Sequence, residues 1–322
     1  VLVISNFLNH EIISKKAYQF FKTLNYRKFS IFLNKLSGNY GIIINSTKIN
    51  YGITDHIASF PIFYDKDNFV FKFNIKKDPK KKIDKFSLNN LLKTGYCLNN
   101  KTLDERIIQL SPGVIYNSNT FKYIHNEYLP KNSLSKSIDN LNNLIDEIFL
   151  NFKKIIDGRS KIFLSLSAGK DSRLIAAKLH EHNFKNVICY TYGKKHSLDF
   201  KLSKIICKKL KFKHVFLEIN NEISKKIFLS PERIKYWKIY FQNNSVPNMQ
   251  DFYALYLLKE SGLIKKNNNY FINGQTADFL TGAQLIKDKS KDLFLEKFIN
   301  KHFSLLNQKN DISDIYKSIK KE

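Results

Sequence analysis

The chain has 322 residues, of which 43% are hydrophobic and 25% charged, and its net charge is +26. This composition excludes an intrinsically disordered chain, and the absence of any run of 18 uncharged apolar residues excludes a transmembrane helix. A positive field of this size could attract nucleic acid, but the basic residues are spread along the chain among many Asn, Ile and Phe, so we do not expect nucleic-acid binding. The three cysteines are far apart and odd in number, which suits a reducing compartment and indicates a cytoplasmic protein.

The first part of the chain has the pattern of two helices followed by antiparallel strands. Residues 8–36 are predicted to be mostly helical. The stretches "NYGIIIN" and "KINYGIT" flank a short turn, and a second turn at Asp65–Asn68 interrupts "FPIFYDKDNFVFKFNI". One more hairpin is predicted within residues 111–128, around Asn117. We therefore predict an antiparallel α+β domain over residues 1–128.

The pattern changes at about residue 129, where strands and helices begin to alternate. A long amphipathic helix is predicted over residues 133–157. It is followed by strands at 161–166, 187–192 and 214–219 and by helices at 172–183 and 198–210. Such alternation is typical of a doubly wound parallel sheet, so we predict an α/β domain over residues 129–322. The chain begins with Val1 and not Met, which leaves open whether it is a fragment.

The stretch "LSLSAGKDSRLIAAKL" places small, hydroxyl and acidic residues between a buried strand and a helix. A loop at this place lies at the carboxyl edge of a parallel sheet, where the N–H groups of the loop and of the following helix favour anions. Ser167 and Ser172 add hydroxyl donors, Gly169 permits a tight turn, and Asp171 can hold the Mg²⁺ that neutralises a triphosphate. These residues indicate a site for a nucleotide pyrophosphate. The alternative is a polar turn capped by a serine.

Three loops resemble those of the asparagine synthetase family. "SAGKDS" is similar to the PP-loop, Ser-Gly-Gly-x-Asp-Ser, of ATP pyrophosphatases, with Ala168 in place of the first glycine, and it does not fit the Walker pattern. The spacing of Gly193, Ser197 and Asp199 resembles the Gly-x3-Ser-x-Asp turn of asparagine synthetases. "INGQTADFLTGA" resembles the loop Ser-Gly-Glu-Gly-Ala-Asp-Glu-x-x-Gly-Gly of the same family, with Gln275 in place of its first glutamate.

The resemblance implies a set of site residues for ATP and Mg²⁺. Pyrophosphate would be held by Ser167, Ala168, Gly169, Asp171 and Ser172, and adenine by Leu164, Gly193 and Gly274. The implied metal ligands are Asp171 and Asp278, and the implied catalytic residues are Asp171, Gln275 and Asp278. Ser197, Asp199 and Asp251 are weaker candidates for contact with the substrate.

The N-terminal half resembles the last strands of a class II glutamine amidotransferase domain, which implies an Ntn-hydrolase-like fold. The similar stretches are "LSGNYGIII", "GITDHIASFPIFY" and "LLKTGYCLNNKTLDERIIQLSPGVIY". Such a domain needs a cysteine as its first residue, and this chain begins with Val1. Lys35 and Thr54 replace an aspartate and an arginine of the family pattern. A glutaminase site is therefore not supported, and we interpret this domain as a reduced, non-catalytic one.

Together these features predict an ATP-dependent amide ligase that adenylates a carboxylate and releases pyrophosphate. The acceptor could be aspartate or a sugar carboxylate, since similar proteins with reduced amidotransferase domains occur in surface-polysaccharide pathways. Gln275 can position the attacking amine but cannot take its proton. The nitrogen source, ammonia or glutamine, and the formation of a homodimer stay open.

Two other functions are compatible with the sequence. A PP-loop enzyme that modifies tRNA would explain the net charge of +26 better, but it would not explain the N-terminal strands. A catalytically inactive nucleotide-binding or scaffold protein would explain the replacements Gln275 and Lys35.

Overall fold

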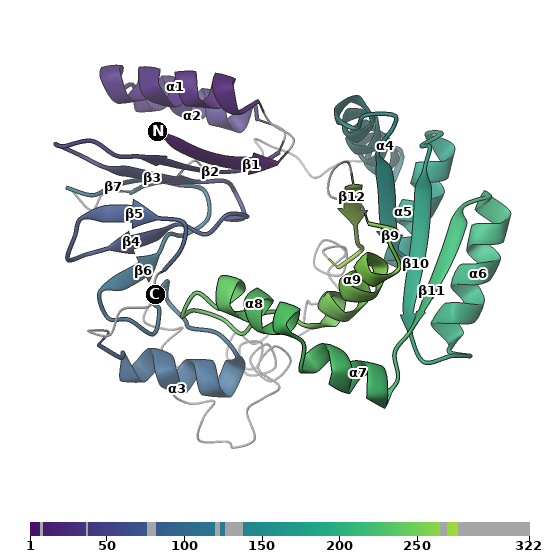
Figure 1. The fold of residues 1–322 in the computed structure, drawn as a ribbon. Helices are drawn as coiled ribbons and strands as arrows, with labels where there is room; N and C mark the ends of the chain where they lie inside the picture. Colours follow the sequence, from purple (N-terminus) through teal and green to yellow (C-terminus); the bar gives the residue numbers. More distant parts are fainter. Residues whose placement is uncertain are drawn as a thin grey trace, which may run out of the picture. The chain divides into compact units, whose positions relative to one another are not determined.

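The structure is a computed structural model that describes residues 1–6, 9–36, 38–75, 82–119, 123–125, 138–264 and 269–275 (Figure 1). It divides into two compact units. Unit 1 holds the described part of Val1–Lys131 together with Trp237–Pro247, and unit 2 holds the described parts of Asn132–Tyr236 and Asn248–Phe294. The boundary predicted between residues 128 and 129 lies outside the described residues. Within those ranges, no helix is long and apolar enough to cross a membrane.

The main sheet of unit 1 is antiparallel. Its strand order is β1-β2-β3-β7-β8, with the bounds β1 Leu2–Asn6, β2 Asn39–Ile44, β3 Tyr51–Thr54, β7 Val114–Asn117 and β8 Tyr123–His125. Helices α1 (His10–Thr23) and α2 (Tyr26–Asn34) cover one face of this sheet (Figure 1). Side chains alternate along β2: Ile42 packs beneath the two helices, and Ile43 packs on the opposite face. The predicted helices and antiparallel hairpins are confirmed, whereas β1 was not predicted.

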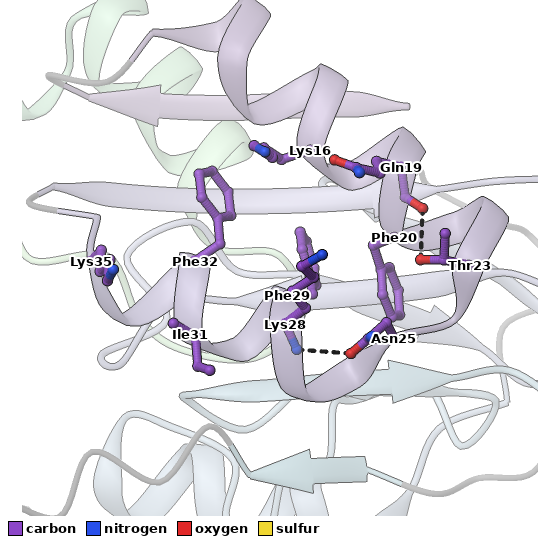
Figure 2. Close-up of a pocket in the computed structure, with 10 residues that line it drawn as sticks. All are labelled: Lys16, Gln19, Phe20, Thr23, Asn25, Lys28, Phe29, Ile31, Phe32 and Lys35. Atoms are coloured by element: carbon purple, nitrogen blue, oxygen red, sulfur yellow. Dashed lines mark hydrogen bonds between the residues drawn. The ribbon is translucent and has the colours of Figure 1, made fainter.

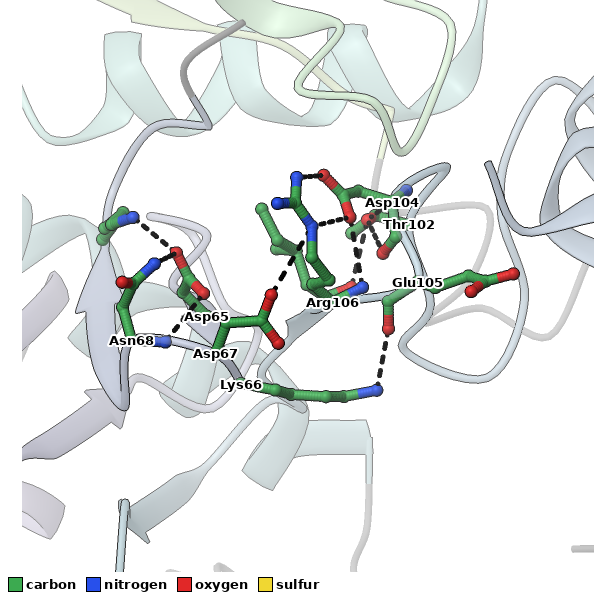
Figure 3. A network of polar contacts seen from close by, with 10 residues as sticks. Asp65, Lys66, Asp67, Asn68, Thr102, Asp104, Glu105 and Arg106 are labelled. Carbon is green, nitrogen blue, oxygen red and sulfur yellow. Dashed lines mark hydrogen bonds and ion pairs between the residues drawn. The ribbon is translucent and has the colours of Figure 1, made fainter. Parts of the chain in front are cut away.

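A second, three-stranded sheet packs on that opposite face. Its order is β5-β4-β6, with the bounds β4 Phe63–Asp65, β5 Val70–Lys72 and β6 Ile107–Gln109, and helix α3 spans Lys85–Thr94. The turn predicted after Asp65 joins β4 to β5. Beside it, Arg106 donates to both carboxylate oxygens of Asp104, at 2.9 and 2.7 Å (Figure 3). Asp104 is 2% exposed, so this bidentate ion pair compensates the buried negative charge of its carboxylate.

Asp55 and Thr54, in the stretch that resembles an amidotransferase, have structural partners in unit 1. The carboxylate of Asp55 accepts hydrogen bonds from the N–H groups of Tyr40, Ile57 and Ser59 at 2.9–3.1 Å. The Thr54 hydroxyl donates to the carbonyl of Ser111 at 2.7 Å. These buried groups tie the end of β3 to its neighbours. The Ntn-hydrolase-like assignment stays a prediction.

Unit 2 is built on a parallel sheet. Its strand order is β11-β10-β9-β12, with the bounds β9 Lys161–Ser165, β10 Val187–Gly193, β11 Lys213–Glu218 and β12 Asn269–Ile272. Its helices are α4 Ile138–Ile155, α5 Lys170–Glu181, α6 Leu198–Leu210, α7 Asn221–Phe228 and α9 Gln250–Glu260. Helix α8, Pro231–Tyr240, begins in unit 2 and ends in unit 1. The alternation of strands and helices predicted for residues 161–219 is confirmed.

Both faces of this sheet are covered, as the doubly wound prediction requires. Ile162 and Leu164 of β9 belong to a core with residues of α4, α5 and α6, whereas Phe163 belongs to a core with Ala254 and Leu258 of α9. The strands of unit 2 therefore bury apolar side chains on two faces, which explains their continuous hydrophobic runs.

The order of the strands reverses beside β9. Chain order runs from β9 through β10 to β11 in one direction, and β12 then pairs with the other side of β9. In open parallel sheets, ligands bind outside the carboxyl ends of the strands at such a switch point. The loops that follow β9 and β12 are therefore the place to look for a site.

Candidate functional site

The loop after β9 is organised by its own serines. The Ser172 hydroxyl lies 3.2 Å from the N–H of Ser167 and 3.2 Å from the Ser167 hydroxyl, which in turn accepts from the N–H of Gly169 at 3.1 Å. Helix α5 begins directly afterwards, and its N-cap residue Gly169 makes no side-chain capping bond. The first N–H groups of a helix have no partner within the helix, so this end of α5 can donate to an anion.

Asp199 connects this loop to the next one along the sheet edge. Its carboxylate accepts the N–H of Ala168 at 2.6 Å and thus holds the loop from the first turn of α6. Ser197 is the N-cap of α6 and accepts from the N–H of Phe200 at 3.2 Å. Asp199 therefore belongs to the site, whereas Ser197 caps the start of α6.

A pocket of about 390 Å³ opens at this edge of unit 2. It is lined by the ends of β9, β10 and β12 and by the starts of α5, α6 and α9. The lining residues are Ser165, Leu166, Ser167, Gly169, Asp171, Ser172, Thr191, Tyr192, Asp199, Gln250, Asp251, Asn273, Gly274 and Gln275. The volume suits a small-molecule ligand.

The loop after β12 packs directly on the start of α5. A Cβ atom placed on Gly274 would lie 3.1 Å from the Cβ of Asp171 and 3.1 Å from the backbone nitrogen of Ser172. Glycine therefore serves close approach here and not an unusual backbone conformation, since a Cβ would require a neighbour to move by a few tenths of an ångström. Asp278, predicted as a second magnesium ligand, lies outside the described residues.

Asp251 organises the opposite wall of the pocket. It accepts a hydrogen bond from the Tyr192 hydroxyl at 3.0 Å with one carboxylate oxygen and from the Gln275 amide at 3.2 Å with the other. Burial, together with the negative charge of Asp251 and this hydrogen bond, raises the pKa of Tyr192 well above its ordinary value. Tyr192 consequently stays protonated at neutral pH and acts as a donor.

The described lining of the pocket is acidic. It contains the carboxylates of Asp171, Asp199 and Asp251 and no Lys or Arg. Within the described part of the chain, no group of three His, Cys, Asp or Glu side chains is arranged to hold a metal ion alone. A magnesium ion that arrives with a nucleotide needs only one or two carboxylates, since phosphate oxygens and water supply its other ligands. Asp171, which lines the pocket from the first turn of α5, fits this requirement.

The structure brings most of the predicted residues together, with clear exceptions. The side chain of Leu164 is fully buried in the core and does not line the pocket, so its contact with adenine stays a prediction. Ala168 contributes its backbone N–H to Asp199, and Gly193 does not line the pocket. Sequence reasoning missed Thr191 and Tyr192, although they stand at the carboxyl end of a predicted strand.

Comparisons with known proteins give little guidance to identity. No protein-family model matches the sequence, and no curated protein matches it. Among solved structures, the NH3-dependent NAD synthetase from Campylobacter jejuni is similar over 58% of this chain and 85% of its own, with 15% identity and a TM-score of 0.32. A predicted subunit of tRNA methyltransferase from Methanocaldococcus jannaschii is similar over 48% of this chain and 73% of its own, with 15% identity and a TM-score of 0.23. Scores this low do not identify a family.

Proposed function

We propose that unit 2 is an ATP-dependent amide ligase of the PP-loop type. It would transfer an adenylyl group to a carboxylate with release of pyrophosphate and then pass the acyl group to ammonia or an amine with release of AMP. One observation carries this proposal. A single pocket at the switch point of the sheet is lined by the start of α5, by two serine hydroxyls and by the carboxylate of Asp171.

The phosphate end of the pocket would lie at the loop after β9. The hydroxyls of Ser167 and Ser172 and the first N–H groups of α5 can donate to the departing pyrophosphate. Magnesium bound with the nucleotide would neutralise phosphate charge, and Asp171 would hold it. Asp199 keeps the loop in shape through its bond to Ala168. The contribution of these residues is positioning and electrostatic stabilisation.

The amine would approach from the wall that carries Asp251. The Gln275 amide nitrogen donates to Asp251, which leaves its carbonyl oxygen as the group that would accept an N–H of the amine. Tyr192 holds the second oxygen of Asp251 and fixes this arrangement. Gln275 would thus orient the amine, and the lost proton would go to solvent or to Asp251.

For the acceptor we propose aspartate or a sugar carboxylate, with ammonia as nitrogen donor, and for the protein a cytoplasmic location.

The test is pyrophosphate release from ATP and Mg²⁺ by the full chain, with ammonium and a panel of aspartate and uronic acids. Asp171→Asn should lower the rate at least about a hundredfold, because the ion loses its protein ligand. Glu181→Gln, at the other end of α5, removes an equal charge outside the pocket and should leave the rate unchanged. No release by the parent chain with any acceptor, or equal rates in both variants, would refute the ligase.

The net charge of +26 favours a second candidate, a PP-loop enzyme that adenylates a base in tRNA. This enzyme would release pyrophosphate only when tRNA is added, and it would shift tRNA in a native gel at low salt. A chain that binds ATP but releases no pyrophosphate with either substrate class would be the inactive nucleotide-binding homologue.

A further inference from the structure

Unit 1 contains a second pocket, far in sequence from the loops of unit 2. It has a volume of about 340 Å³ and lies between α1 and α2 (Figure 2). Three aromatic rings, Phe20, Phe29 and Phe32, and three lysines line it together with shorter polar side chains. All of these residues belong to one helical hairpin, so the pocket does not depend on the placement of any other segment.

The floor of this pocket is aromatic and held by the core. The rings of Phe20 and Phe29 are stacked, with centroids 4.5 Å apart and planes 10° from parallel, and Phe32 lies 6.1 Å from Phe29. Phe20 and Phe29 are buried, and both belong to the core beneath the helices. Phe32 is only partly buried, so its ring, packed on this fixed pair, is the aromatic surface on which an apolar group could rest.

The rim of the pocket is positively charged and lacks local compensation. Lys16, Lys28 and Lys35 are exposed, and none of them forms an ion pair with another described residue. Glu11 is the only acidic residue in residues 9–36, and its carboxylate already binds Lys15 at 2.6 Å. Flexible lysine stems allow the three ammonium groups to converge on one anion above the rings.

Two other polar side chains of the pocket, those of Thr23 and Asn25, shape the hairpin. Leu24 ends α1 in the left-handed conformation, with φ of 50°. Asn25 caps α2 by accepting the N–H of Lys28 at 3.0 Å, and the Thr23 hydroxyl donates to the Gln19 carbonyl at 3.0 Å (Figure 2). This tight two-residue connection brings the end of α1 beside the start of α2 and creates the hollow between them.

We propose that this pocket binds a small organic anion that carries one carboxylate or phosphate group on an apolar body. The apolar body would lie on the phenylalanine rings, and the acid group would bind the lysine ammonium groups. The volume lies in the range of small-ligand sites, and the lysines surround a hollow instead of following a stripe, which favours a small ligand over nucleic acid. The proposal is independent of the function assigned to unit 2.

The test is displacement of 1-anilinonaphthalene-8-sulfonate fluorescence from the full chain by octanoate, by octyl phosphate and by octanol. We expect one saturable site at which the two anions compete and octanol does not. The triple variant Lys16→Gln, Lys28→Gln, Lys35→Gln should weaken binding of the better anion at least about tenfold, because its charge-assisted contacts are lost. Competition by octanoate alone would identify a carboxylate site, and competition by octyl phosphate alone a phosphate site.

The matched control removes three charges from the same helices outside the lining, as Lys15→Gln, Lys22→Gln, Arg27→Gln, and should keep the affinity within about twofold. Near-ultraviolet circular dichroism confirms that each variant keeps native packing, since loosened cores also bind the dye. Equal weakening in both triple variants, or equal competition by octanol, would overturn the proposal. So would binding confined to double-stranded DNA or to vesicles containing phosphatidylglycerol.

Discussion

Replacing Gly274 with alanine tests the contact between the two loops of the candidate site. The added Cβ would lie 3.1 Å from the Cβ of Asp171 and 3.1 Å from the nitrogen of Ser172. Favourable carbon contacts occur at about 3.5–4.0 Å, so either loop must move by a few tenths of an ångström. The backbone that would move belongs to the first turn of α5, to which we assign the phosphates.

Two effects of different size should follow from Gly274→Ala. Overpacking of this kind costs about 1–3 kcal/mol when the surroundings do not relax, and each kcal/mol lowers the melting temperature of a unit of this size by about 2–4 °C. Displacement of the phosphate-binding backbone should reduce pyrophosphate release at least about tenfold. The loss of activity should therefore exceed what the loss of folded protein explains.

The assays are thermal unfolding and pyrophosphate release, each compared with Gly158→Ala. A Cβ on Gly158 would meet no atom within 4 Å, so this control should change the free energy of unfolding by no more than about 0.5 kcal/mol. If Gly274→Ala behaved like the control in both assays, the loop after β12 would not pack on α5 as described. The assignment of this loop to the candidate site would then be wrong.

Two further predictions concern ionisable groups. Asp251→Asn should lower the pKa of Tyr192, because the negative charge that helps to raise this pKa would be gone while the burial remains. Ultraviolet titration measures this pKa when the curve of the Tyr192→Phe variant is subtracted. An unchanged pKa would argue against the hydrogen bond between Tyr192 and Asp251. In unit 1, burial raises the pKa of Asp65, but hydrogen bonds, above all from Lys72 at 2.7 Å, outweigh it and hold the pKa below its usual value. The charged carboxylate thus stabilises the fold above the unfolded pKa of about 3.9, and this stability is lost as the pH falls through the lower folded pKa. Lys72→Met should therefore move acid unfolding, followed by circular dichroism, to higher pH, and an unmoved midpoint would contradict this account.

The sequence by itself determined the alternating strands and helices at the centre of unit 2 and predicted the chemistry of the loop after β9. Hydrophobic periodicity is local, so the alternating strands and helices of residues 161–219 were predicted close to their observed bounds. The residue types in "SAGKDS" predicted a loop for anions at the end of β9, because a strand that runs straight into a helix leaves little choice of geometry. The prediction of Ser167, Asp171 and Ser172 in one pocket followed from that.

Only the tertiary structure decided which distant residues meet. The Tyr192 hydroxyl and Asp251 are 59 positions apart, and Trp237–Pro247 returns to unit 1, where the carbonyl of Asn244 accepts the N–H of Cys97 at 2.7 Å. Similarly, pairing of β12 with β9 placed Gly274 against α5. Local patterns specify how a segment folds, but the order of strands and the meeting of loops depend on packing between segments, which no short stretch of sequence encodes.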